Sequence, residues 1–377
     1  MKNYKIVSFF NKIFLLSRYK YYFSIPNKKY FCIYDDNNTF LQNYFNQKTE
    51  FIKHNKINIF ILFLLLFKNG INIKEFMLNY LIEYIKYVQA KIFISNIDNN
   101  ILFWRIKKFI PDIKIIIIQN GWRLKKYDIF EKINKKNEYK SDLFFTFNNY
   151  ISIKYSNYIN SKFITIGSLE NNYRKVTKFK NSRTVLFLSE YIGNEKSPFF
   201  IDNKINFNSW YNPELNLLVF LKKYCLENNY TFKVSPRTNK FKEEYAFYKN
   251  ILGNNHWEFL DKNKTSSYHE IDKAKIAIAI SSTIGYEALA RGKKVIFFAC
   301  RKTRKESGNF GWPVIKKNKG LFWTNNLDIY EFKKILDRIL CMNDASWNFQ
   351  SKKIINKLIN YDKNNSIFKK EISAIIH

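Results

Sequence analysis

Short apolar runs alternate with amphipathic stretches through the first half of the chain. The runs at 91–95 and 115–118 are short and rich in isoleucine, which is typical of strands buried on both faces of a parallel sheet. Residues 71–89 place apolar side chains at helical spacing, and a second helix over 101–109 should stop before Pro111. The alternation predicts a parallel α/β sheet. The remaining predicted elements are strands at 30–34, 143–146 and 163–166 and helices near 125–136 and 149–158.

A second alternation follows a polar stretch, 167–183, which is expected to be an interdomain linker. It predicts strands at 185–188, 230–234, 257–260, 276–280 and 295–298, and helices at 213–227, 240–250, 268–273 and from 283. A chain of 377 residues is too long for one ordinary core. The expected domains are an acceptor-side domain at 1–175, a nucleotide-donor domain at 183–345 and a helical tail at 346–377.

The stretch 275–298 is the most informative part of the sequence, because it reads as strand, turn, helix and strand. Ser281, Ser282 and Thr283 stand where the helix should begin, with Ser282 or Thr283 as its cap, and Gly292 ends it. Hydroxyls and free backbone N–H groups at a helix start, on the carboxyl edge of a parallel sheet, can bind a phosphate. Glu287 lies one turn further, within reach of an attached ribose or base. An ordinary capped helix with an exposed glutamate would have the same spacing.

Two loops of the first half should lie on the corresponding edge of their own sheet. Asp98 follows one predicted strand, and Gln119, Asn120, Gly121 and Arg123 follow the next. Ligands of open α/β sheets bind at that edge. A tight turn at Asn120-Gly121 is the alternative reading.

Loops after two strands of the second half carry further candidates. Ser235 and Arg237 flank Pro236 after one predicted strand, and Glu190 follows another. The forked guanidinium of arginine suits a phosphate or a carboxylate, and a surface arginine after a turn proline is the alternative. Arg301 to Arg304 forms a basic loop for which phosphate contact and plain solvation both remain open.

The segment Ser281-Ser282-Thr283, Gly285-Tyr286-Glu287-Ala288-Leu289, Gly292 and Val295 resembles the nucleotide-binding segment of GT-B glycosyltransferases. It is most similar to surface-carbohydrate (capsule and lipopolysaccharide) biosynthesis proteins of the polysialyltransferase-like and Kdo-transferase-like kind. The resemblance implies a GT-B-like α/β fold of two Rossmann-like parallel-sheet domains facing a cleft. It also implies that the serine pair holds the donor phosphate and that Glu287 contacts the nucleotide's sugar or base. The family has a similar Asp-Asn and Gln-Asn-Gly in its first domain, and many members have histidine where this chain has Ser235.

The composition is strongly basic, with 64 Lys and Arg against 31 Asp and Glu, a net charge of +33. Lysine, asparagine, isoleucine, tyrosine and phenylalanine are abundant together while Gly (10) and Pro (6) are scarce, which indicates codon bias towards A and T. The lysines are spread along the chain without a basic tail or zinc-finger spacing, so the pattern does not favour a nucleic-acid binder. Attraction to an anionic donor or an anionic membrane surface is expected instead.

Several classes are disfavoured by the remaining patterns. The longest apolar stretch, 57–67, is too short for a spanning helix and is expected to be a buried helix or strand, and no signal-peptide pattern follows the N-terminus. The four cysteines and four histidines lack metal-ligand spacing, which predicts buried thiols in a reducing cytoplasm and no metal site. No Asp-x-Asp is present, so a metal-independent reaction without a cofactor is expected.

Together these features predict a cytoplasmic glycosyltransferase, peripheral at the inner face of the cell membrane. It would move a sugar from a nucleotide-sugar to a surface polysaccharide or lipid-linked glycan. The resemblance makes a CMP-activated acidic sugar plausible, with UDP- and GDP-sugars open. Asp98 is the first candidate for the general base and Glu190 the second. The alternatives are a CDP-glycerol or CDP-ribitol phosphotransferase and a non-catalytic carbohydrate-binding protein of the assembly machinery.

Overall fold

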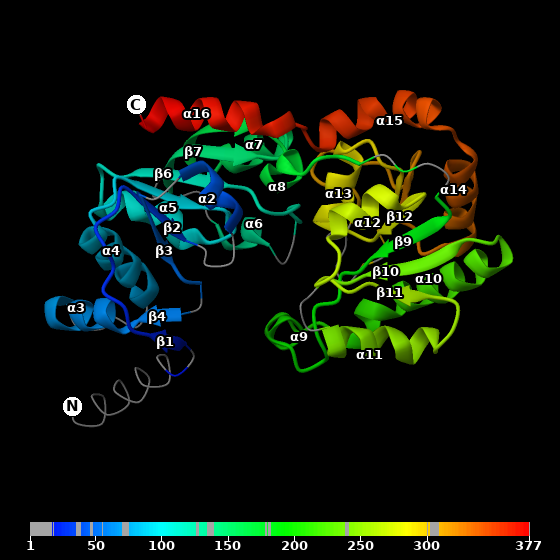
Figure 1. The fold of residues 1–377 in the computed structure, drawn as a ribbon, viewed down its shortest axis with the longest axis horizontal. Helices are drawn as coiled ribbons and strands as arrows, with labels where there is room; N and C mark the ends of the chain where they lie inside the picture. The colour runs from blue at the N-terminus through cyan, green and yellow to red at the C-terminus, as the bar shows by residue number, and fades with distance from the viewer. Residues whose placement is uncertain are drawn as a thin grey trace.

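The computed structural model describes most of the chain, in segments separated by short gaps. The described residues are 17, 19–34, 39–45, 48–54, 56–69, 75–125, 128–133, 139–177, 179, 182–237, 241–299, 301 and 309–376. Two six-stranded parallel sheets lie side by side, the first drawn in blue and cyan and the second in green to orange (Figure 1).

The first sheet has the strand order β3-β2-β5-β6-β7-β8, with every neighbouring pair parallel. Its strands are β2 (Phe31–Tyr34), β3 (Thr49–Ile52), β5 (Ile92–Ser95), β6 (Lys114–Ile118), β7 (Lys140–Thr146) and β8 (Asn160–Thr165). Its helices are α2 (Thr39–Phe45), α4 (Phe76–Val88), α5 (Ile101–Phe109), α6 (Ile129–Lys132), α7 (Asn149–Ser156) and α8 (Leu169–Tyr173).

Both faces of this sheet are covered, which explains its unbroken apolar strands. Ile115 and Ile117 of β6 pack into one core with helices α4 and α5. Ile116 and Ile118 point to the opposite core, which contains residues of α2 and of the C-terminal helix. Each strand therefore needs apolar side chains at successive positions.

The second sheet is also entirely parallel, in the order β11-β10-β9-β12-β13-β14. Its strands are β9 (Thr184–Leu188), β10 (Thr231–Ser235), β11 (Glu258–Phe259), β12 (Ile276–Ala279), β13 (Val295–Phe298) and β14 (Trp323–Thr324). Its helices are α9 (Pro198–Asn203), α10 (Phe207–Glu227), α11 (Phe241–Leu252), α12 (Ser267–Lys273), α13 (Thr283–Ala290), α14 (Ile329–Cys341) and α15 (Asp344–Leu358).

The chain returns to the first sheet at its C-terminus. After the short 3-10 turn η3 (Lys363–Asn365), α16 (Ser366–Ile376) lies along the first sheet, where it is drawn in red (Figure 1). Phe368 is fully buried there against Phe45 and Phe145, whose ring centroids lie 6.5 and 4.9 Å from its own. The tail thus joins the two halves.

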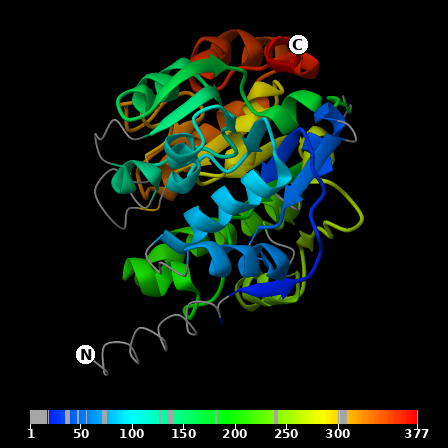
Figure 2. The ribbon, with the colours of Figure 1, turned by 90° about the vertical axis from the view of Figure 1, so that its left-hand side faces the viewer.

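A small two-stranded parallel sheet completes the first half. It consists of β1 (Lys20–Tyr22) and β4 (Lys56–Asn58), and β4 leads directly into α3 (Ile59–Asn69). These elements lie at the end of the molecule remote from α16 (Figure 2).

Most predicted elements are confirmed to within about two residues at their ends, but several expectations were wrong. The helix near 125–136 is only Ile129–Lys132 among the described residues, and the expected linker contains α8. Helix α10 begins at Phe207 and accommodates Pro213 in its first turns. The apolar stretch 57–67 is not wholly buried, because α3 exposes an apolar face. Residues 35–38, Cys300 and most of the basic loop at 301–304 lie outside the described residues.

Candidate functional site

The main cavity of the described residues, about 690 Å³ in volume, opens at the carboxyl ends of β9, β10 and β12. Asn120, Leu124, Glu170 and Arg174 line it from the first half of the chain. The second half contributes a dense set of hydroxyls, Ser189, Ser235, Thr265, Ser266, Ser267, Ser281, Ser282 and Thr283. The volume suits a nucleotide or nucleotide-sugar. This is also the sheet edge at which such ligands bind in parallel α/β folds.

Helix α13 starts at the cavity wall. Ser282 occupies the N-cap position, as one of the two predicted caps, but its side chain makes no capping hydrogen bond. Thr283 is the first helical residue, and its hydroxyl oxygen accepts a hydrogen bond of 2.8 Å from the backbone N–H of Trp122. Gly292, with φ of +77°, follows the last turn as expected.

Glu190 organises the turn before α13. Its carboxylate accepts from the backbone N–H and the hydroxyl of Ser281 and pairs with Arg301 Nη1 at 2.7 Å. Arg301 in turn pairs with the buried carboxylate of Glu214 and lies 4.8 Å from the ring centroid of Trp210. Glu190 is thus occupied by three donors, which gives it a structural role. Arg301 points inward to this network and lines the cavity, so of the two readings left open for the loop, plain solvation does not hold at Arg301.

The side chains of Arg237 and Lys262, in the cavity wall, contact backbone carbonyl oxygens. These oxygens carry no formal charge, so they do not neutralise the two cations. Arg237 Nη1 lies 3.4 Å from the carbonyl oxygen of Glu190, and Lys262 Nζ donates to the carbonyl oxygen of Arg237 at 2.5 Å. The side chain of Glu244 fixes the same loop by accepting from the Arg237 N–H. Both cationic side chains line the cavity, where they could pair with a phosphate.

Glu287 joins the two halves of the chain at the cavity. It accepts from Ser168 Oγ at 2.5 Å and from Tyr268 OH at 2.9 Å. Burial raises the pKa of Glu287 to about 7, and the two hydroxyl donors oppose that effect. Its carboxyl group can therefore gain or lose a proton near neutral pH.

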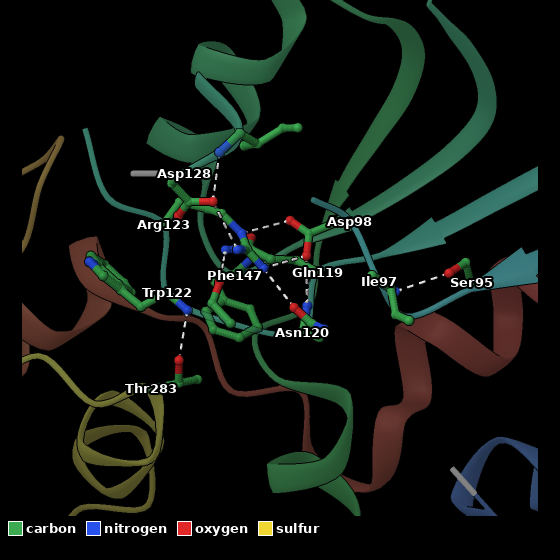
Figure 3. A network of polar contacts seen from close by, with 12 residues as sticks. Ser95, Ile97, Asp98, Gln119, Asn120, Trp122, Arg123, Asp128, Phe147 and Thr283 are labelled. Atoms are coloured by element: carbon green, nitrogen blue, oxygen red, sulfur yellow. Dashed lines mark hydrogen bonds and ion pairs between the residues drawn. The ribbon is translucent and has the colours of Figure 1, made fainter. Parts of the chain in front are cut away.

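Asp98 is completely buried behind the cavity, at the centre of the network in Figure 3. It accepts from Arg123 Nε and Nη2, from Tyr155 OH at 2.7 Å and from the Asn120 N–H at 3.1 Å. Burial raises the pKa of the Asp98 carboxyl, and the Arg123 charge and the hydrogen bonds from Tyr155 and Arg123 oppose that shift. Burial lowers the pKa of the Arg123 guanidinium, but Asp98 and Asp128 outweigh it and raise that pKa above its usual range. With four donors and no exposure, Asp98 does not contact the cavity as a base would, which contradicts its selection as first candidate.

The Asp98 network holds the loop 119–123 against α13. Gln119 fixes this loop by donating to the Gly121 carbonyl oxygen and accepting from the Phe147 N–H, both at 2.8 Å. A Cβ at Gly121 would lie 3.3 Å from Thr283 Oγ1, so the glycine permits a close approach of the two halves. The rings of Trp122 and Tyr286 then stack with centroids 3.8 Å apart and planes 6° apart.

The structure divides the predicted site residues into two sets. Those that line the cavity are Asn120, Glu190, Ser235, Arg237, Ser281, Ser282, Thr283 and Glu287. Those that lie behind it and position the loop are Asp98, Gln119, Gly121 and Arg123.

Sequence reasoning missed Glu170, Arg174, Lys262 and Tyr268, which all line the cavity. The polar run around Glu170 was the available signal, but it was interpreted as a linker. The sequence around Tyr268 contains no motif that would have predicted its hydrogen bond to Glu287.

Three smaller findings bear on chemistry. Within the described segments, no group of three or more His, Cys, Asp or Glu side chains could hold a metal ion. None of the described helices is both long enough and apolar enough to cross a bilayer. Cys32 and Cys225 are buried free thiols as expected, whereas Cys341 is exposed.

The protein has a GT-B fold. It has two Rossmann-like parallel sheets, a nucleotide-sized cavity lined from both halves, and a C-terminal helix that returns to the first sheet. Residues 116–374 match the family described as "putative O-antigen biosynthesis protein". Because the match spans more than half of the sequence, the chain belongs to this family. A search of curated proteins finds no match.

Solved structures share the fold at low sequence identity. S. aureus MnaA in complex with UDP is 13% identical, with a TM-score of 0.53 over 93% of this chain and 96% of that one. A structure from Listeria monocytogenes described as a "putative UDP-N-acetylglucosamine 2-epimerase" is 12% identical, with a TM-score of 0.52 over 92% and 96%. Wall teichoic acid polymerase TagF with CDPG is 12% identical, with a TM-score of 0.48 over 93% and 88%. For MnaA and the Listeria protein, these identities mean that the likeness concerns the fold alone.

Proposed function

We propose that this protein is a glycosyltransferase of O-antigen assembly, which transfers a sugar from a nucleotide-sugar to a glycan or lipid-linked acceptor. The observation that carries the proposal is the cavity at the carboxyl edge of the second sheet, where hydroxyls of the second half converge with cations of both halves. Membership of the O-antigen biosynthesis family supports it.

The donor phosphates would lie at the start of α13. The side-chain hydroxyl of Ser282, which makes no capping bond, and the helix dipole favour an anion there, and Arg237 and Lys262 supply positive charge from the opposite wall. The Ser281 hydroxyl, which donates to Glu190, would hold the turn that presents these groups. These groups would stabilise the nucleotide as it leaves. Glu287 would contact the nucleotide's ribose or base, in keeping with the family resemblance. Glu190 and Asp98 would position the two loops rather than react.

Glu170 is our candidate for the base that activates the acceptor. Its side chain is half exposed and pairs with Arg174 at 3.0 Å. A smaller cavity extends to Ile118, at the carboxyl end of β6 in the first sheet. It shares Glu170, Asn120 and Glu287 with the main cavity. An acceptor entering from the first half would therefore meet Glu170 before it met the donor phosphates.

The donor is a further part of the proposal. A CMP-activated acidic sugar remains the first choice, and UDP- and GDP-sugars are the others. Metal independence and association with the inner membrane surface are likewise proposed. A polyol-phosphate transferase, a nucleotide-sugar epimerase and a non-catalytic binding protein are the rivals that the experiment must separate.

The experiment measures thermal stabilisation of the purified protein by CMP, CDP, UDP and GDP, each with and without Mg²⁺. One nucleotide should give a saturable shift that Ser282→Ala and Arg237→Gln weaken about tenfold in apparent affinity. The matched control is Ser209→Ala, an exposed serine near the start of α10 and outside the cavity, which should bind as wild type does.

Turnover is then followed with the sugar derivative of that nucleotide. Release of the nucleotide with transfer of the sugar supports the proposal, and Glu170→Gln should abolish it while the thermal shift remains. Isomerised sugar still attached to the nucleotide would instead show an epimerase. No shift with any nucleotide would refute the donor site.

A further inference from the structure

Helix α3 presents an apolar face to the outside of the molecule. Ile61 and Leu65 are buried against the first half, whereas Phe63, Leu66 and Phe67 are 54%, 39% and 87% exposed. The exposed three lie on one face of the helix, opposite the buried pair. A surface helix normally carries polar residues there.

A second apolar set lies beside it. Tyr21, Phe23 and Ile25 are 41%, 67% and 59% exposed. The strand β1 that contains Tyr21 pairs with β4, and β4 ends at Asn58, where α3 begins. The side chain of Asn58 also donates to the Ser24 carbonyl oxygen at 2.9 Å. Figures 1 and 2 show β1 and α3 together at one end of the molecule.

The surroundings of this surface are basic. The segments 19–34 and 56–69 contain five lysines and no aspartate or glutamate. Lys20 and Lys28 are exposed beside the second set. Lys68, 59% exposed at the end of α3, pairs with Glu83 at 2.5 Å. The surface therefore combines large apolar side chains with an excess of positive charge.

We propose that this surface, formed by residues 20–25 and the exposed face of α3, docks onto an anionic phospholipid membrane. Aromatic and leucine side chains would enter the interface between headgroups and acyl chains, and the lysines would contact anionic headgroups. Charge complementarity favours this occupant over a second copy of the chain, because two copies would oppose the same basic rims. The inference does not depend on the donor chemistry.

The experiment is co-sedimentation of the full-length protein with vesicles of phosphatidylcholine, alone or mixed with phosphatidylglycerol. The wild type should bind the anionic vesicles, more weakly as salt is added. Phe63→Ser/Phe67→Ser should bind at least about tenfold more weakly. Lys20→Gln and Lys28→Gln should each weaken binding by about fivefold.

The matched control is Leu327→Ser/Phe349→Ser, which removes side chains that are 54% and 86% exposed in the second half. It should bind as wild type does, and melting temperatures should show that all variants are folded. The proposal is overturned if the wild type does not bind anionic vesicles. It is equally overturned if Phe63→Ser/Phe67→Ser and Leu327→Ser/Phe349→Ser bind them with the same affinity. It is also overturned if Phe63→Ser/Phe67→Ser dissociates an oligomer in sedimentation velocity while vesicle binding is unchanged.

Discussion

Carboxylates that look alike in the sequence have different hydrogen-bond partners in the folded protein. Glu190 and Asp98 are each occupied by cationic and neutral donors. Glu287 receives only neutral hydroxyl donors in the contacts described above, and burial raises its pKa to about 7 from the ordinary 4.5. Glu287 therefore differs from Glu190 and Asp98, although all three were predicted site residues.

The elevated pKa of Glu287 predicts a pH-dependent stability. Between pH 4.5 and 7 the folded protein retains a proton that the unfolded chain has lost, so stability falls as the pH rises through this window. The Glu287→Gln side chain cannot ionise and does not lose stability in this way. The free energy of unfolding of the variant minus that of wild type should therefore increase by up to about 3 kcal/mol as the pH rises from 4.5 to 8. Urea unfolding at several pH values measures the difference.

Glu195→Gln, at an exposed position, controls for the general effect of removing a negative charge. A Glu287→Gln advantage that grows towards low pH, rather than high pH, would show that Glu287 is stabilised as the anion.

At the scale of the element, α13 is placed by tight packing of its glycine rather than by its N-cap. A Cβ at Gly285 would lie 2.9 Å from Ala279 Cβ and 3.0 Å from Phe297 Cζ. The helix therefore lies directly on β12 and β13, which brings its first turn to the cavity. The sequence predicted the helix and its end, since both depend on local signals.

Gly285→Ala should accordingly destabilise the protein. Alanine gains about 1 kcal/mol of helix propensity over glycine, but the close contacts should cost more, for a net loss of about 1–2 kcal/mol. The melting temperature should fall, and nucleotide affinity should fall with it because the helix start moves. Gln350→Ala, exposed in α15, is the control and should be neutral. A variant more stable than wild type would mean that α13 is not held this closely.

At the scale of the whole molecule, the C-terminal helix joins the two halves. Phe368 is completely buried among aromatic rings of the first half, whereas its neighbour Ile367 is 42% exposed. Asn172 and Asp362 add a hydrogen bond of 3.2 Å between α8 and the segment that leads to α16. The first half is therefore completed by residues from the far end of the chain.

Phe368→Ala should cost about 3–5 kcal/mol in urea unfolding, because it leaves a cavity in the core of the first half. Ile367→Ala, the adjacent control, should cost less than about 1 kcal/mol. Equal effects of the two substitutions would show that α16 does not dock on the first sheet in solution.

The sequence by itself determined the type and order of most elements, because the spacing of apolar residues is a local property. It also indicated the α13 start and the Asn120 loop, since both carry polar residues directly after apolar strands. Only the tertiary structure decided which side chains face the cavity. The bonds from Trp122 to Thr283 and from Ser168 to Glu287 join residues 161 and 119 positions apart. Glu170 lines the cavity and one apolar face of α3 is exposed. The sequence could predict neither, because the exposure of a side chain depends on distant segments that only the fold brings together.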